Sequence, residues 1–133
     1  MGEMLHERVG ICVPTYFGSK LLPVTFASLF EQTYQDFHVY VRDDTPPHAV
    51  EEREAMRKYI ESLNDLRFEY VANPENLGYP RNLMALVDGA KEDLIFLLAQ
   101  DDVLSPIAVE SCVRALYENP GTAAVARPYY LSL

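Results

Sequence analysis

The chain has 133 residues, carries a formal net charge of −9, and is 49% hydrophobic and 23% charged. This composition is typical of one globular domain and argues against a disordered segment. The acidic balance argues against a broad nucleic-acid-binding surface. The two cysteines, Cys12 and Cys112, make no disulfide framework, and no zinc-ligand spacing is present. We expect both thiols to be buried in a reducing compartment.

Short apolar runs and helical patterns alternate along the chain. Residues 9–13 predict a buried strand that Pro14 ends. Ser19 is placed to cap a helix that runs to about Gln32, with Pro23 in its first turn. The elements expected after it are a strand over 37–41, a helix over 48–64, a strand over 67–72, an irregular loop over 73–82, a helix that carries residues 83–90, a strand over 93–98, a helix that begins at Ser105–Pro106 and a strand over 122–126.

This alternation predicts an α/β fold, in which a mainly parallel sheet with right-handed crossovers has helices on both faces. The GxGxxG and GxxxxGK[ST] phosphate loops are absent, which excludes a standard dinucleotide site and a P-loop enzyme. There is no signal peptide and no apolar run of about 20 residues. We therefore expect a cytoplasmic protein with no membrane segment in this chain, peripheral to the inner membrane face only as part of a longer protein.

The apolar run over 94–98 predicts a strand that is buried on both faces, and Asp101 and Asp102 follow shortly after it. Ligands of open α/β sheets bind at the carboxyl ends of the strands. Two carboxylates at such an end are suited to Mg²⁺ or Mn²⁺. The alternative is that both residues only turn the chain and cap the helix that starts near Ser105.

Three further segments are expected at the same edge of the sheet, namely Pro14-Thr15-Tyr16, Asp43-Asp44 and the loop from Asn76 to Asn82. A carboxylate there is able to accept hydrogen bonds from a base N–H or from ribose hydroxyls. Tyr16 offers a face for base stacking, and Arg81 a charge for phosphate. Each feature also has a plain alternative: a strand stop, a turn, backbone freedom at Gly78, or a surface ion pair of Arg81.

Four motifs together resemble the family 2 glycosyltransferases of the GT-A fold. They are VGICVPTY over 9–16, FEQTYQDFHVYVRDD over 30–44, NPENLGYPRN over 73–82 and FLLAQDDVLSP over 96–106. Their order and spacing match over nearly the whole chain. The resemblance implies a Rossmann-like, nucleotide-binding half of the GT-A fold. It also implies an inverting transfer of a sugar from a nucleoside diphosphate sugar, usually a UDP-sugar, to a carbohydrate or glycoconjugate acceptor, with Mg²⁺ or Mn²⁺ as cofactor.

The resemblance also implies roles for individual residues. Thr15 and Tyr16 would lie near the base, one acid of the Asp43-Asp44 pair would bind the uridine, and Arg81 would contact the nucleotide. The full set of expected nucleotide-binding residues is Pro14, Thr15, Tyr16, Asp43, Asp44, Asn76, Gly78, Arg81 and Asp101, and the expected metal ligands are Asp102, the preferred one, and Asp101.

Two features depart from the family pattern. Ala99 stands where many members have the first Asp of an Asp-x-Asp-Asp motif. The family's chain normally continues further and there supplies the acceptor site and the carboxylate general base. Residues 1–133 are therefore expected to form a single donor-binding domain without the acceptor part, and we identify no catalytic base in it.

Two alternatives stay open: a non-catalytic nucleotide-sugar-binding module and an inactive truncated fragment. A receiver or phosphatase domain is disfavoured, because its key Asp would stand where Pro14-Thr15-Tyr16 follows the first strand. If an acceptor part normally covers the sheet, uncovered apolar surface would favour a homodimer. Candidates for that surface are Phe37, Tyr40, Tyr129 and Tyr130.

Overall fold

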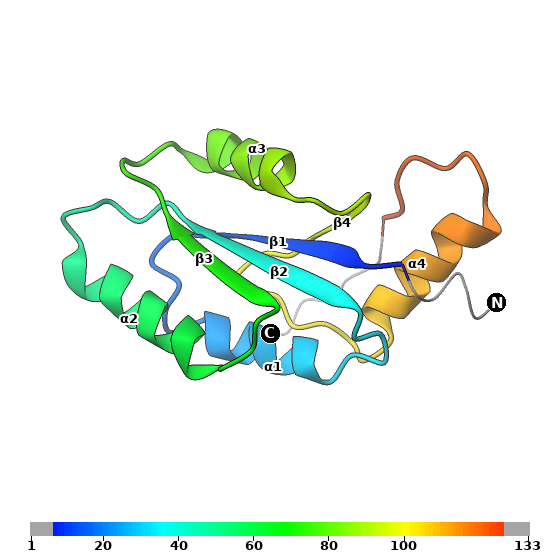
Figure 1. Ribbon diagram of the computed structural model, residues 1–133, viewed down its shortest axis with the longest axis horizontal. Coiled ribbons are helices and arrows are strands. Elements are labelled where there is room, and N and C mark those ends of the chain that lie inside the picture. Colours follow the sequence, from blue (N-terminus) through cyan, green and yellow to red (C-terminus); the bar gives the residue numbers. More distant parts are fainter. Residues whose placement is uncertain (1–6, 127–133) are drawn as a thin grey trace, which may run out of the picture.

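The computed structural model describes residues 7–126, and its strands and helices alternate along the chain (Figure 1). The elements are β1 Val9–Thr15, α1 Leu22–Phe30, β2 Phe37–Asp43, α2 Val50–Ser62, β3 Phe68–Ala72, α3 Tyr79–Gly89, β4 Leu94–Leu97 and α4 Ala108–Glu118. The four strands form one parallel sheet in the order β3-β2-β1-β4. The expected α/β fold with a parallel sheet is therefore confirmed.

The order of the strands decides which helix covers which face. From β1 the chain steps in one direction to β2 and β3, and then crosses back to β4. Right-handed crossovers in opposite directions place their helices on opposite faces. Figure 1 accordingly shows α1 and α2 on one side of the sheet and α3 on the other. All four strands end at the same edge, on the left of that view.

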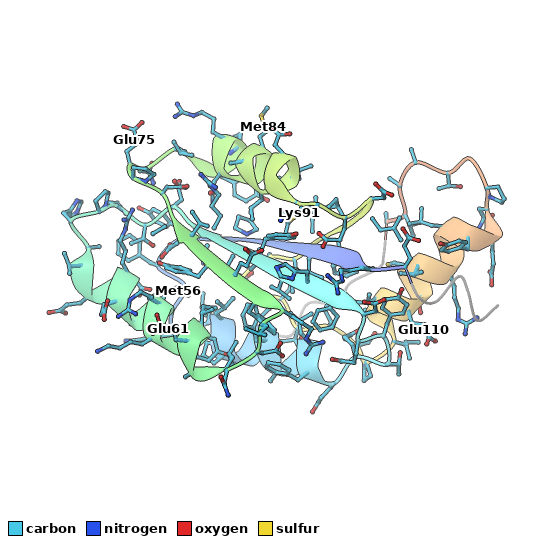
Figure 2. All side chains as sticks on the ribbon, viewed as in Figure 1. Met56, Glu61, Glu75, Met84, Lys91 and Glu110 are labelled. Atoms are coloured by element: carbon cyan, nitrogen blue, oxygen red, sulfur yellow. The ribbon has the colours of Figure 1, made fainter. Side chains whose placement is uncertain are left out.

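The larger core lies between the sheet and the helices α1, α2 and α4. Alternate residues of β1 and β2 face it, and in β2 buried and half-buried positions alternate strictly. Phe26 of α1 is fully buried, with its ring centroid 5.0 Å from that of Phe68. Figure 2 shows Met56 of α2 between its helix and the sheet, whereas Met84 lies on the outward side of α3.

Ser28 of α1 and Gln32, two residues past the end of that helix, tie the segment between β4 and α4 to this core. The side-chain amide of Gln32 accepts from the Val109 N–H (3.1 Å) and donates to the Ser105 carbonyl (2.7 Å). The Leu104 N–H donates to the Ser28 hydroxyl. Buried polar groups need partners, and here these partners fix the chain that follows β4.

The strand β1 continues through Pro14 to Thr15, so the expected stop at Pro14 is wrong. In a parallel strand the N–H and carbonyl of one residue face the same neighbour. Cys12 accepts from the Leu98 N–H on the β4 side, while Thr15 accepts from the Asp44 N–H on the β2 side. Pro14 therefore faces β4, whose ladder has already ended, and its lack of an N–H costs no ladder bond.

The expectation that 94–98 is buried on both faces is also wrong within residues 7–126. There β4 is an edge strand, and Leu97 is 51% exposed. The strand expected over 122–126 does not form, and this segment is irregular and exposed. Its small side chains, Ala123 and Ala124 among them, bury too little apolar area to dock on so short a strand.

The helices begin later or earlier than expected. α1 begins at Leu22, and Ser19 does not cap it, because its N–H and hydroxyl both donate to the Glu52 carboxylate (3.1 and 2.7 Å). α3 begins at Tyr79, inside the expected loop, and α4 begins at Ala108. In each case a proline lies in or just before the first turn, where its missing N–H has no helical partner to lose.

Several other expectations concern single residues. Cys12 is fully buried, which raises the pKa of its thiol to about 11, and Cys112 is partly buried. Phe37, expected at an exposed surface, is buried in the core. Tyr40 is half-buried, and its hydroxyl donates to Glu92. Tyr129 and Tyr130 lie outside the described residues. None of the helices within residues 7–126 has the length and apolarity that crossing a bilayer requires.

Replacing Phe26 tests the core between α1 and the sheet. We expect Phe26→Ala to lower the free energy of unfolding by about 3–5 kcal/mol, because it leaves a cavity where no solvent enters. Val24→Ala, on the exposed side of the same helix, should change it by less than about 0.5 kcal/mol. Denaturant unfolding of both variants measures the difference. Equal losses would contradict this placement of the core.

Candidate functional site

A cavity of about 360 Å³ opens at the edge of the sheet where the strands end. Three loops, which follow β1, β2 and β3, meet there with the segment after β4. The lining residues are Pro14, Thr15, Tyr16, Asp44, Asn76, Gly78, Tyr79, Asn82, Ala99 and Gln100. Figure 2 marks the loop that follows β3 through its label on Glu75, the neighbour of Asn76. Most of the residues that were expected together at this edge of the sheet therefore line the cavity.

Asp44 is the most heavily bonded side chain of the site. One carboxylate oxygen accepts from the Leu77 N–H (2.7 Å) and from Asn73 Nδ2 (2.9 Å), and the other from the Gly78 N–H (2.9 Å) and from Asn76 Nδ2 (3.1 Å). A carboxylate has about four lone-pair sites, so these donors fill them. The carboxylate is buried and holds the loop over residues 76–78 against the end of β2.

The fully buried side-chain amide of Asn73 holds Asp44 in place. Asn73 donates to Asn82 Oδ1 as well as to Asp44, and its own Oδ1 accepts from Arg42 Nε at 2.7 Å. Asn82 in turn donates to the Arg42 carbonyl at 3.0 Å. Arg53 of α2 donates to the carbonyls of Asn73 and Thr45. This network joins the ends of β2 and β3 to the first turn of α3.

A glycine is required at position 78 because of its backbone conformation. Its φ of +87° and ψ of 155° belong to a region that only glycine populates readily. The conformation turns the Gly78 N–H toward Asp44 and lets Tyr79 begin the helix. An added Cβ would meet no atom within 4 Å, so conformation and not space explains the glycine.

Asp43 is buried on the other side of the strand end and does not line the cavity. Its carboxylate accepts from the N–H and hydroxyl of Thr45 (3.1 and 2.6 Å) and from the Tyr70 hydroxyl (2.7 Å). Burial, together with that hydrogen bond, raises the pKa of Tyr70. Of the Asp43-Asp44 pair, Asp44 is thus the one at the cavity.

Thr15 supplies the one buried side-chain polar atom without a hydrogen-bond partner in residues 7–126, its hydroxyl oxygen. A buried hydroxyl without a partner costs free energy, and such atoms in native proteins call for an explanation. Next to it, Tyr16 is 52% exposed, and its ring meets Phe17 edge to face at 4.8 Å. Tyr79, also largely exposed, lines the cavity as a second aromatic side chain.

Gln100 joins the segment after β4 to the loop after β1. Its side-chain amide accepts from the Tyr16 N–H at 2.9 Å and donates to the Tyr16 carbonyl at 3.0 Å. Sequence analysis did not single out this residue. The available signal was a polar residue with one donor and one acceptor between an apolar strand and an acidic pair.

Asp101 and Asp102 are exposed in the turn that follows, and neither lines the cavity. The turn is held at both ends, since the Thr25 hydroxyl donates to the Gln100 carbonyl (2.7 Å) and Ser28 accepts from the Leu104 N–H. No cluster of three or more His, Cys, Asp or Glu suited to a metal occurs in residues 7–126. The pair still fits Mg²⁺ or Mn²⁺, because such ions are often held by one or two carboxylates plus substrate phosphates.

Arg81 lies exposed in the first turn of α3 and is not part of the cavity lining. Within residues 7–126 its guanidinium makes neither an ion pair nor a hydrogen bond, so the surface ion pair considered for it does not form there. Six of the expected residues thus line the cavity, namely Pro14, Thr15, Tyr16, Asp44, Asn76 and Gly78. Four do not, namely Asp43, Arg81, Asp101 and Asp102. Tyr79 and Asn82, which belong to the expected loop from Asn76 to Asn82 but were not named as site residues, also line it, as do Ala99 and Gln100.

Comparison with known proteins relates this fold to a group of sugar-transferring enzymes. The family model described as "Glycosyl transferase family 2" matches residues 10–132. A chondroitin synthase of Escherichia coli is 29% identical over 134 residues, which cover 97% of this chain but 18% of that protein. The chain thus spans less than a fifth of this relative's length.

Solved structures agree in fold. The S. aureus TarS fragment 1–349 in complex with UDP-GlcNAc has a TM-score of 0.67 at 20% identity, over 84% of this chain and 31% of that one. The mannosyltransferase PcManGT of Pyrobaculum calidifontis, in complex with GDP-Man and Mn²⁺, has a TM-score of 0.61 at 24% identity, over 72% of this chain and 28% of that one.

Removing one acceptor oxygen from Asp44 tests the loop that it holds. We expect Asp44→Asn to lower the free energy of unfolding by roughly 1–3 kcal/mol, because buried donors lose their acceptor. The amides of Leu77 and Gly78 should exchange with solvent faster. Asp88→Asn, an exposed carboxylate on α3, is the matched control. Unchanged exchange at both amides in Asp44→Asn would contradict this role.

Proposed function

Because the chain belongs to glycosyl transferase family 2, we propose that it forms the donor-binding part of an enzyme that transfers a sugar from a nucleoside diphosphate sugar to a hydroxyl acceptor. The observation that carries the proposal is the cavity at the carboxyl edge of the sheet, with a carboxylate pair just beyond it. Support for this donor class comes from the TarS and PcManGT structures, which hold UDP-GlcNAc and GDP-Man. We take UDP as the nucleotide to test first.

In this proposal the base occupies the side of the cavity formed by the loop after β1. The Thr15 hydroxyl hydrogen-bonds the base, and the half-exposed ring of Tyr16 stacks on it. Because the hydroxyl oxygen is covered by its neighbours, a base would reach it only after a small shift of the side chains above it. Asp44 acts indirectly, since its acceptor sites are filled by the loop that bears Asn76 and Gly78.

The diphosphate extends toward the exposed acids. Asp102 and Asp101 would hold Mg²⁺ or Mn²⁺, and Arg81, which has no protein partner in residues 7–126, would neutralise phosphate charge. A divalent ion bound there supplies charge stabilisation for the leaving diphosphate. The turn that bears the two acids is anchored to α1 through Thr25 and Ser28, which keeps their backbone in place.

The transfer itself is proposed to invert the anomeric carbon, with the acceptor hydroxyl attacking opposite the diphosphate. A base must then take the proton of that hydroxyl. We assign this base to none of residues 7–126, and we assign residues 1–133 to the donor part of the enzyme alone. A cytoplasmic location and a homodimer are part of the same proposal.

A second candidate is a nucleotide-sugar-binding module without transfer activity. Ala99, which lines the cavity where many family members have an acid, favours it. Sugar transfer by a longer protein that contains this chain would reject this candidate.

Replacing Thr15 separates a ligand-binding hydroxyl from a structural one. We expect Thr15→Val to weaken UDP binding about fivefold through the loss of one hydrogen bond. Its stability should not fall, since this hydroxyl has no partner to lose. Thr25→Val, whose hydroxyl donates to the Gln100 carbonyl, should instead lose stability. Calorimetric titration and thermal unfolding give both quantities. Lower stability with unchanged affinity in Thr15→Val would refute the assignment.

Removing the metal tests the carboxylate pair. We expect Mn²⁺ to strengthen UDP binding to the natural chain at least tenfold. Asp102→Ala should abolish that gain, because the carboxylate that would link the metal ion to the protein is lost. Calorimetric titration of UDP with Mn²⁺, and with EDTA in its place, measures the gain. Asp88→Ala is the matched control. An equal Mn²⁺ effect in Asp102→Ala would remove Asp102 from the metal site.

A further inference from the structure

We propose that Gln100 is a positioning residue that locks the backbone of Tyr16 to the segment bearing Asp101 and Asp102. In the proposed function these two places hold the base and the diphosphate of the donor, so the inference rests on that function. The lock itself is a contact within the protein, and it is testable without any nucleotide.

The contact consists of two hydrogen bonds. The Tyr16 N–H donates to Oε1 of Gln100, and the Tyr16 carbonyl accepts from Nε2 of the same amide, although the residues are 84 positions apart. A side chain must offer one acceptor and one donor side by side to satisfy both backbone groups. Gln does so, whereas an ionised Glu has no donor for the carbonyl.

Each side of the lock is anchored in the core. The Gln100 carbonyl accepts from the Thr25 hydroxyl of α1 at 2.7 Å. On the other side, the Phe17 N–H donates to the Thr45 hydroxyl at 2.9 Å, and Phe17 has a φ of +49°, in the left-handed region. The loop after β1 is therefore held in an uncommon conformation by Thr45 from the loop after β2 and by Gln100 from the segment after β4.

Gly18 makes room for the lock. A Cβ at this position would overlap Oε1 of Gln100 and would lie 3.0 Å from its Cδ. The φ of Gly18 lies outside the left-handed region, so the backbone would accept Ala. The requirement for glycine thus comes from the Gln100 amide. Gly18→Ala should break the lock without any change at Gln100 itself.

The consequence for binding is preorganisation. A cavity whose two sides are fixed relative to each other loses less conformational entropy when a ligand spans them. With the lock in place, Tyr16 and the turn that bears Asp101 and Asp102 hold one separation. Without the lock, the loop after β1 and the acidic turn each keep their own anchors, but the distance between them is no longer fixed.

Amide hydrogen exchange of the natural chain and its variants tests the lock directly. We expect the Tyr16 amide to exchange about fivefold faster in Gln100→Ala and in Gly18→Ala. Gln100→Glu, which keeps the acceptor, should stay near the natural rate at this amide. The Phe17 amide, held by Thr45, is an internal control that should not change.

The double variant Gly18→Ala/Gln100→Ala gives the sharper result. If the two residues act through one contact, it should exchange no faster than either single variant. Gly89→Ala is the matched glycine control, since a Cβ there meets nothing within 4 Å. Additive effects, or a Tyr16 amide that is unprotected in the natural chain, would overturn the lock. Because Gly18→Ala leaves Gln100 in place, a folding defect of Gln100→Ala does not decide the outcome.

Titration of UDP with Mn²⁺ then tests the positioning role. We expect a loss of affinity of about fivefold in both single variants, no further loss in the double variant, and partial recovery in Gln100→Glu. Unchanged affinity despite faster exchange would confine Gln100 to a structural role and overturn the proposal. If the natural chain bound no UDP, the proposed function would fail and the positioning role with it, while the exchange result would still decide the lock.

Discussion

The site depends on one buried carboxylate. Taking an ionised Asp44 out of water is costly unless its oxygens are hydrogen-bonded, and the four donors that fill them come from Asn73 and from the loop over 76–78. The loop cannot leave without stranding that charge. The end of β2, the loop after β3 and the first turn of α3 therefore behave as one unit, and this unit forms one side of the cavity.

The other side depends on α1. Thr25 and Ser28 lie on its buried face and Gln32 lies two residues past its end, and all three side chains bond to the backbone that follows β4. A short edge strand offers little ladder to hold that backbone, so side chains of a neighbouring helix hold it instead. The acidic turn thus owes its position to a helix that lies far from it in sequence, and the Gln100 amide carries that position across to Tyr16.

In the donor-site proposal, metal and nucleotide depend on each other. Asp101 and Asp102 are exposed, and two carboxylates leave most of the coordination sphere of Mg²⁺ or Mn²⁺ to other ligands. The diphosphate supplies such ligands and needs the cation, because a chain with a net charge of −9 offers little attraction of its own. Under this proposal the acidic turn would bind the metal ion together with the donor diphosphate and not the metal ion alone.

Local pattern alone determined the alternation of strands and helices, the parallel sheet and the edge at which the polar residues meet, because apolar periodicity and proline chemistry act within a few residues. The family resemblance added roles for individual residues, and six of the expected residues, Thr15, Tyr16 and Asp44 among them, line the cavity. Tertiary structure alone decided what depends on distant partners. Within residues 7–126 it placed β4 at the edge of the sheet, paired Ser19 with Glu52 instead of leaving it as a helix cap, put Asp44 and not Asp43 at the cavity, and brought Gln100 to Tyr16. No local pattern encodes these outcomes, since each is a contact between residues that only the fold brings together.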